Sequence, residues 1–211
     1  MGELASRSWT GGSDELDLER TLEVIGGEPF PEGDDLIVRE RVRQARAVVL
    51  VVDLSGSMKG ERVRTAAAAV GALAGELARD RLAVVAFWSD AAVLVRLGEP
   101  AEPLAILDLL LRVPAQGLTN VGFALEVAAR QLAGVQPRDA RVLLLSDCVH
   151  NAGPDPRLTA ARLPRLDVLL DTSGEQDVEL ARDLARLSHG RVRPVRDHRD
   201  VAVALRGLFV D

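Results

Sequence analysis

Short, unbroken apolar runs alternate along the chain with longer segments whose apolar residues recur at helical spacing. The clearest run is Ala47–Val52, six apolar residues that end at Asp53. Runs this short and continuous are typical of parallel strands buried on both faces. The alanine-rich segment Val63–Leu77 that follows predicts a helix. Further strands are predicted at Arg81–Trp88, Ala91–Leu97, Arg141–Asp147, Leu166–Leu170 and Arg191–Val195. Further helices are predicted at Glu102–Val113, Asn120–Leu132, Gln176–Ser188 and Asp197–Phe209.

This alternation of strands and helices predicts an α/β fold with a doubly wound, mostly parallel sheet and helices on both faces. Ala91–Leu97 is the exception, because the turn candidate Ser89-Asp90 makes it the antiparallel hairpin partner of the strand before it.

Residues 1–45 are predicted to be a leader that precedes a domain of residues 46–211. Residues 1–14 are polar and rich in glycine and serine, and we expect a mobile end there. A short helix is predicted up to Ile25, because apolar residues stand at positions 18, 22 and 25 and Gly26-Gly27 follows as a stop. Residues 35–46 alternate enough to predict an extended edge segment.

Composition narrows the function classes. The 211 residues carry a net charge of −6 and only 3% aromatic residues. Nucleic-acid binding is therefore disfavoured, since it usually needs a basic face and aromatic stacking platforms. No apolar run approaches the ~18 residues of a membrane span, and the N-terminus lacks the apolar core of a signal peptide, so we expect a cytoplasmic protein. Cys148 is the only cysteine, which rules out a disulfide within the chain.

The candidate chemistry lies at the ends of the predicted central strands. Asp53, Ser55 and Ser57 follow the first buried strand at a spacing of two, in the loop before a helix. Alternate side chains of an extended segment point to one side, so three oxygens can converge there. In open α/β sheets, ligands bind at this edge. Downstream, Thr119 directly precedes a predicted helix and Asp147 ends another buried strand.

The pattern D-x-S-x-S after an apolar strand resembles the metal-ion-dependent adhesion site (MIDAS) of von Willebrand factor A (vWA) domains. The resemblance implies a Rossmann-like fold with one short antiparallel edge strand, for which Ala91–Leu97 has the right spacing. The segment Gln116-Gly117-Leu118-Thr119-Asn120 is similar to the threonine loop of that family, and Asp147 to its distal aspartate. The resemblance covers residues 46–211. It implies metal coordination by residues that match Ser55, Ser57 and Thr119, and a water-mediated role for those that match Asp53 and Asp147.

Hydroxyl and carboxylate oxygens are hard donors, and no histidine or cysteine set has zinc spacing. Mg²⁺ is therefore the expected ion, with Mn²⁺ or Ca²⁺ as alternatives. The resemblance implies a metal-dependent protein-interaction module, in which a Glu or Asp of a partner protein completes the coordination of the ion. Two positions depart from the family, which often has glycine where this chain has Leu118 and Cys148. His150 is expected at the rim of the site.

The N-terminal segment D-L-D-L-E-R-T-L, with G-G and an arginine-rich run after it, resembles the bacterial CoxE-like branch of vWA proteins. That resemblance implies an adaptor for a MoxR-type AAA+ ATPase. One alternative is a Mg²⁺-dependent haloacid-dehalogenase-like phosphatase with Asp53 as nucleophile. Such enzymes need a second carboxylate two residues later, where this chain has Ser55, so we do not expect an enzyme. The other alternative is a metal-free structural scaffold.

Overall fold

The computed structural model describes residues 3–9, 11, 15–26, 35–42, 45–55, 61–76, 80–100, 102–113 and 117–209. The chain divides into two compact units, residues 1–44 and residues 45–211, which are described separately below.

The first unit is a two-stranded antiparallel sheet with one helix. Strand β1 (Glu3–Ser8) pairs along its whole length with β2 (Ile37–Val42), and helix α1 (Leu18–Ile25) lies between them in sequence. Thr21 anchors the helix, because its buried hydroxyl donates to the Ile37 carbonyl oxygen at 3.0 Å and accepts from the Ile37 N–H at 2.9 Å. The predicted helix and extended segment are both present.

The prediction of a mobile end over residues 1–14 is wrong for Glu3–Ser8. The sequence E-L-A-S-R-S holds one large apolar residue, so its side chains give no alternating pattern from which a strand could be predicted. Its order comes instead from backbone pairing with β2, which does not depend on side-chain type.

The second unit is built on a six-stranded sheet in the order β5-β4-β3-β6-β7-β8. Neighbouring strands are parallel except β4 and β5, so the predicted fold class, with its antiparallel edge strand, is confirmed. The strands are β3 (Ala47–Asp53), β4 (Arg81–Phe87), β5 (Ala91–Val95), β6 (Ala140–Ser146), β7 (Leu166–Asp171) and β8 (Val192–Val195). The helices are α2 (Glu61–Glu76), α3 (Pro103–Arg112), α4 (Val121–Gln131), α5 (Pro156–Ala160), α6 (Val178–Leu187) and α7 (His198–Phe209), with a 3₁₀ turn at Pro137–Asp139.

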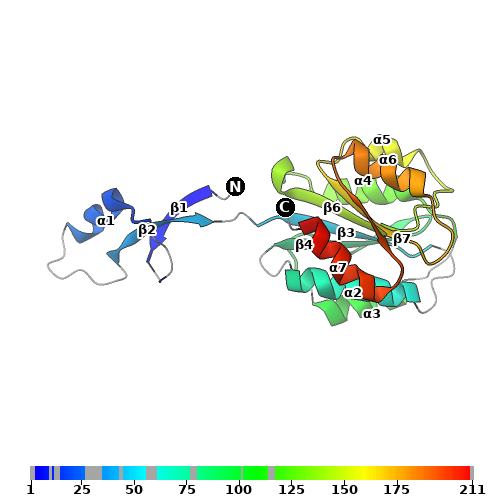
Figure 1. The fold of residues 1–211 in the computed structure, drawn as a ribbon, viewed down its shortest axis with the longest axis horizontal. Helices are drawn as coiled ribbons and strands as arrows, with labels where there is room; N and C mark the ends of the chain where they lie inside the picture. The colour runs from blue at the N-terminus through cyan, green and yellow to red at the C-terminus, as the bar shows by residue number, and fades with distance from the viewer. Residues whose placement is uncertain are drawn as a thin grey trace. The chain divides into compact units, whose positions relative to one another are not determined.

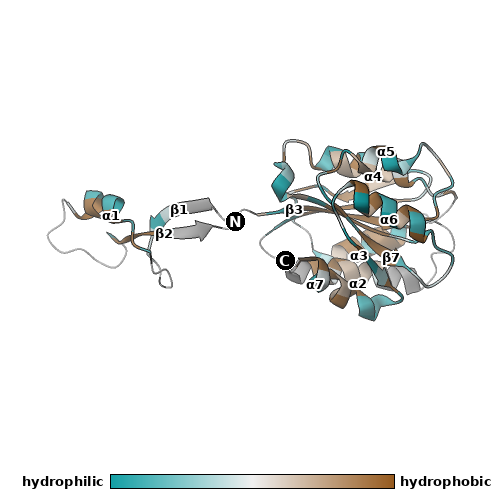
Figure 2. Cartoon of the chain, turned by 45° about the horizontal axis from the view of Figure 1, so that its top comes forward, coloured by the Kyte–Doolittle hydropathy of each residue, from teal (hydrophilic) through white to brown (hydrophobic). Residues whose placement is uncertain are grey.

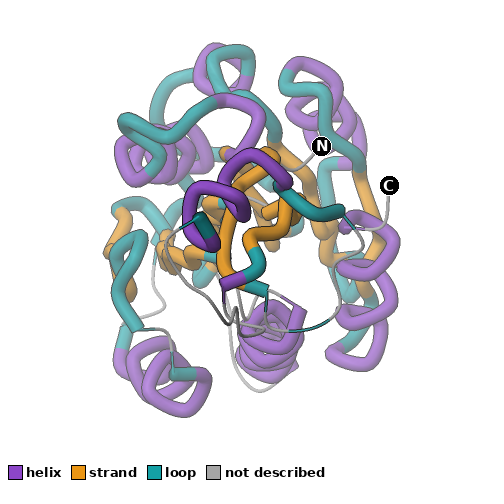
Figure 3. The backbone as a smooth tube through the Cα atoms, turned by 90° about the vertical axis from the view of Figure 1, so that its left-hand side faces the viewer, coloured by secondary structure: helices purple, strands orange, loops and turns teal. Residues whose placement is uncertain are grey.

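Helices cover both faces of this sheet (Figure 1; Figure 3). Side chains of a strand point alternately to its two faces, and the core divides accordingly. Val49 and Val51 pack with apolar residues of α4 and α6, whereas Val48, Leu50 and Val52 pack with residues of α2, α3 and α7. Figure 2 shows the result, with apolar strands in the middle and polar residues on the outer sides of the helices. Every residue of β3 is buried, as its unbroken apolar run predicts.

The direction in which the strands follow one another reverses at the middle of the sheet. From β3 the chain proceeds to β4 on one side, and β6 lies on the other side. The carboxyl ends of β3 and β6 therefore lie at the point where the strand order reverses, which is where doubly wound sheets bind ligands. Within the described part of the chain, no helix has the length and apolar character needed to cross a bilayer.

Candidate metal site

Asp53 is the last residue of β3 and lies buried at this reversal point. Both of its carboxylate oxygens accept hydrogen bonds. Oδ1 accepts from the backbone N–H of Ser55 at 2.9 Å and from the Ser55 hydroxyl at 2.5 Å. Oδ2 accepts from the hydroxyl of Ser146, the last residue of β6, at 2.5 Å. The carboxylate therefore joins the ends of two neighbouring strands.

Thr119 reaches the same point from a different loop. Its hydroxyl donates to Ser55 Oγ at 2.6 Å, across 64 residues of sequence. The backbone of Thr119 is held in turn by Asn151, whose side-chain oxygen accepts the Thr119 N–H at 2.7 Å. The following residue, Asn120, caps α4 by accepting the Phe123 N–H at 3.0 Å. Thr119 thus precedes the cap residue, and its own hydroxyl remains available to the site.

Asp147 follows β6 directly and is also buried. Its carboxylate oxygen accepts the backbone N–H of Val149 at 3.0 Å. Cys148 is fully buried and has a φ of 61°, a left-handed conformation that favours glycine. Burial is also the main reason that the pKa of the Cys148 thiol is raised, so this thiol stays protonated and acts as apolar packing.

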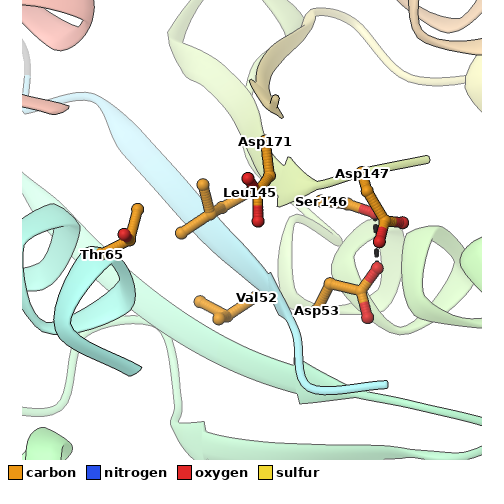
Figure 4. A pocket seen from close by; sticks show the side chains of 7 residues that line it. All are labelled: Val52, Asp53, Thr65, Leu145, Ser146, Asp147 and Asp171. Atoms are coloured by element: carbon orange, nitrogen blue, oxygen red, sulfur yellow. Dashed lines mark hydrogen bonds between the residues drawn. The ribbon is translucent and has the colours of Figure 1, made fainter. Parts of the chain in front are cut away.

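A cavity of about 10 Å³ is lined by Asp53, Ser146 and Asp147. It has roughly the room that one water molecule needs. Figure 4 shows the Asp53 and Asp147 carboxylates near one another at this cavity, together with the Ser146 hydroxyl. Asp171, the last residue of β7, and Thr65 of α2 line the cavity as well. Desolvation by burial raises the pKa of Asp53 to about 6; hydrogen bonds from Ser146 and Ser55 oppose the rise, and the charge of Asp147 adds to it.

The donor set fits a hard divalent cation. Two oxygens on adjacent vertices of an octahedron around Mg²⁺ are about 3 Å apart, close to the 2.6 Å between the hydroxyl oxygens of Thr119 and Ser55. No three His, Cys, Asp or Glu side chains among the described residues are placed to hold an ion by themselves. A cation here would therefore rely on hydroxyl oxygens. Such an ion would also offset the cost of burying Asp53 and Asp147 in one place.

Of the five predicted site residues, four belong to this arrangement: Asp53, Ser55, Thr119 and Asp147. Ser57 lies outside the described residues. Two residues that take part were not predicted, namely Ser146 and Asn151. Ser146 could have been found as the last polar residue of its strand. Asn151 gives no such signal, because its partner is a backbone N–H of a distant loop.

His150, predicted at the rim, is half-buried, and its Nδ1 is a buried nitrogen without a hydrogen-bond partner in the structure. It directly precedes Asn151 in the loop that holds Thr119. An unpaired buried nitrogen costs free energy, which water or a bound group can recover.

Comparison with known proteins gives both a family match and a fold match. Residues 48–150 match the family model described as the von Willebrand factor type A domain. An uncharacterized protein of Synechocystis sp. is 31% identical over 110 residues, a match that covers 51% of this chain and 26% of that protein. This chain therefore spans about a quarter of the length of that curated relative.

Solved structures share the fold at low identity. The von Willebrand factor type A protein of Catenulispora acidiphila has a TM-score of 0.64 and 20% identity, with coverage of 81% of this chain and 43% of that one. Manganese-loaded TRAP protein of Plasmodium vivax has a TM-score of 0.61 and 21% identity, and the match covers 77% of this chain and 72% of that one. Proximal thread matrix protein 1 of the mussel byssus, with a zinc-occupied MIDAS motif, has a TM-score of 0.61 and 15% identity. The match covers 78% of this chain and 47% of that one. Residues 48–150 therefore match the von Willebrand factor type A family model, and the second unit has the fold of these solved structures.

Proposed function

We propose that this protein is a metal-dependent protein-interaction module. Five residues at the carboxyl edge of the sheet would hold Mg²⁺, three through their hydroxyl oxygens and the two aspartates through water, and a Glu or Asp of a partner protein would complete its coordination. The observation that carries the proposal is the contact from Thr119 through Ser55 to Asp53, which brings hard oxygens of two distant loops to one point. The five proposed ligands are Asp53, Ser55, Ser57, Thr119 and Asp147.

The charge of this donor set supports a role in recognition. Three of the five residues are neutral hydroxyl donors, so the proposed set contains two anionic groups, Asp53 and Asp147. A divalent cation that keeps open coordination positions attracts a further carboxylate, because oxygen anions are its preferred ligands. The zinc in the MIDAS motif of proximal thread matrix protein 1 and the manganese in TRAP protein, two proteins that share this fold, support a divalent ion in this proposal.

The finer proposal is an adaptor that works with a MoxR-type AAA+ ATPase, as in the CoxE-like branch. It rests on the N-terminal sequence that resembles this branch, which includes the residues of α1. A cytoplasmic setting belongs to the same proposal, because an AAA+ ATPase acts where ATP is available.

A non-enzymatic role is also part of the proposal. An Asp nucleophile needs a carboxylate oxygen that is free to attack a substrate, whereas both oxygens of Asp53 accept short hydrogen bonds. The position two residues later, which phosphatases of the rival class fill with a carboxylate, is Ser55. These observations favour binding over phosphoryl transfer.

Metal binding is the first point to test, by thermal and urea unfolding of the full chain with MgCl₂ or with EDTA. Mg²⁺ at a hundredfold excess over its Kd stabilises a folded protein by about 2.7 kcal/mol. We expect this gain for the wild type and for Ser173→Ala, because the exposed Ser173 bonds to Asp171 through its backbone N–H, which alanine keeps. Ser55→Ala should fold but gain much less. No gain in the wild type would favour the metal-free scaffold.

Partner binding is tested by affinity capture from a bacterial extract with the same three proteins, each with Mg²⁺ and with EDTA. We expect proteins that wild type and Ser173→Ala retain only with Mg²⁺ and that Ser55→Ala does not retain. An AAA+ ATPase among them would support the adaptor role. Equal capture in all samples would contradict metal-dependent recognition, and a phosphatase substrate screen would follow.

A further inference from the structure

The loop that carries Thr119 also carries an exposed apolar residue, Leu118, at the position before it. Leu118 is 53% exposed, although its neighbour Thr119 is buried and in contact with Ser55. An exposed leucine by itself is ordinary. This one precedes a proposed metal ligand, so whatever approaches the ion through this side of the site comes near it.

Hydrogen bonds on both sides of the loop keep Leu118 in this position. On one side, the Thr119 carbonyl oxygen accepts the N–H groups of Asn151 and Ala152, both at 3.2 Å, and the Asn151 side chain holds the Thr119 N–H. On the other side, the Asn120 N–H donates to the Trp88 carbonyl oxygen at 2.8 Å. The backbone around Leu118 is therefore fixed, and its side chain is not drawn into the core.

The backbone at Gly117 adds to this restraint. Its φ is 90°, which favours glycine, and a side-chain carbon at this position would lie 3.5 Å from Ser89 Oγ. The loop therefore packs against the turn at Ser89-Asp90, where Asp90 is exposed. The charges of Asp90 and the buried Asp147 would repel additional acidic residues of a ligand.

We propose that Leu118 is a specificity-determining contact that selects a partner segment in which an apolar residue lies next to the metal-binding Glu or Asp. This inference rests on the proposed function. The acidic residue would meet the ion, while the apolar neighbour would cover Leu118. Removal of such a contact should weaken binding about five- to tenfold, the effect of losing part of one buried aliphatic side chain.

The test uses a library of short random peptides displayed on phage, selected on the immobilised full chain with MgCl₂ and with EDTA. Three proteins are compared: wild type, Leu118→Ser, and Leu104→Ser as the matched control. Leu104 is 81% exposed on α3, outside the site. Selected peptides are then synthesised, and their affinities are measured by calorimetry.

We expect Mg²⁺-dependent enrichment of an acidic residue with an apolar neighbour on wild type and on Leu104→Ser. On Leu118→Ser the acidic residue should remain and the apolar preference should disappear, with a five- to tenfold loss of affinity for the wild-type peptides. Acidic peptides without apolar neighbours, or an apolar preference that persists in Leu118→Ser, would overturn the inference alone. No Mg²⁺-dependent enrichment of acidic residues would overturn the proposed function together with it.

Discussion

Burial raises the pKa of the Asp53 carboxyl to about 6, against an ordinary value of 3.8. The folded, metal-free protein therefore holds this proton more tightly than the unfolded chain does. Its contribution to stability is fully present below the unfolded value and is lost as the pH rises through the folded value. The loss amounts to about 3 kcal/mol, because each pKa difference of one corresponds to ~1.4 kcal/mol.

We expect the free energy of unfolding of the wild type in EDTA to fall, relative to Asp53→Asn, between about pH 4 and pH 7. Urea titrations of both proteins across this range measure the difference. The Asp53→Asn variant keeps an oxygen for the Ser55 hydrogen bonds but does not ionise at this position. Because Asp53→Asn leaves every other titratable group in place, the difference between the two proteins reports on Asp53 alone. Parallel pH profiles of the two proteins would contradict a raised pKa at Asp53.

Asn151 gives a second prediction at this scale. Its side chain positions Thr119, but Asn151 is not one of the five residues proposed to hold the ion. Asn151→Ala removes the 2.7 Å bond to the Thr119 N–H, and we expect about tenfold weaker Mg²⁺ binding from the misplaced hydroxyl. Asn151→Asp retains an acceptor oxygen and should restore most of the affinity. Mg²⁺ titrations by calorimetry, with unfolding curves in EDTA, separate this effect from stability. Equal Mg²⁺ affinity of wild type and Asn151→Ala would show that Thr119 needs no such support.

These two residues also show what sequence could predict about the site. Asp53 was predicted because a carboxylate after an unbroken apolar strand stands out, and Ser55 because it repeats at a spacing of two. Asn151 acts through one hydrogen bond to a backbone group 32 residues away. Such a bond depends on the relative positions of the Thr119 loop and the Asn151 loop in the folded chain. No pattern in the sequence indicates those positions.

At the scale of elements, the threonine loop and the loop after β6 approach each other closely enough to require glycine. Gly153 has a φ of 82°, and a side-chain carbon there would lie 2.4 Å from Asn120 Oδ1. That oxygen caps α4. Gly134 is the matched control, because its φ is 80° and nothing lies within 4 Å of the same carbon.

We expect Gly134→Ala to lose about 1 kcal/mol of stability from the left-handed backbone alone. Gly153→Ala should lose about 2 kcal/mol, because it also displaces the helix cap, and it should weaken Mg²⁺ binding through the neighbouring Thr119. Urea unfolding in EDTA and Mg²⁺ titration measure the two effects. Equal losses of stability in the two variants, with unchanged Mg²⁺ affinity, would mean that the loop adapts to the added carbon.

The elements themselves were predictable wherever burial imposes a pattern. Strands β3, β6 and β7 follow from their largely apolar sequences, since every residue in them is buried. Helix α5 was not predicted, because its five residues (Pro156–Ala160) are too few to show a helical period. Strand β1 was not predicted either, since backbone pairing with β2 and the Ser6–Asp17 hydrogen bond hold it rather than an apolar pattern.

At the scale of the whole molecule, the two units differ in how much apolar surface they bury. The large unit covers both faces of its sheet with helices. In the small unit, helix α1 buries Thr21 and leaves Leu18 and Leu22 64% and 65% exposed. Among the described residues of this unit, Val38 is the large apolar side chain that is buried, and its 44 residues lie near the limit of about 40 below which domains usually need added restraints. Its polar network must therefore carry much of its order.

Asp17 is the centre of that network. It accepts the Ser6 hydroxyl at 2.6 Å, pairs with Arg39 Nε at 3.2 Å and caps α1. The Ser6 hydrogen bond is the main reason that the pKa of Asp17 is lowered. A lowered folded-state pKa means that this stabilisation is present above the unfolded value of 3.8. It is lost as the pH falls through the still lower folded value.

We therefore expect the small unit to unfold first on acidification, and Asp17→Asn to unfold it already at neutral pH while the large unit stays folded. Each unit contains one tryptophan, Trp9 and Trp88, so the fluorescence of Trp88→Phe reports on the small unit and that of Trp9→Phe on the large one. Asp183→Asn is the matched control, because the pKa of Asp183 in α6 is lowered as well, by surface arginines. It should leave the Trp9 signal unchanged. A single transition seen by both tryptophans in every variant would mean that the two units unfold as one. The small unit would then not depend on its polar network in the way that we infer.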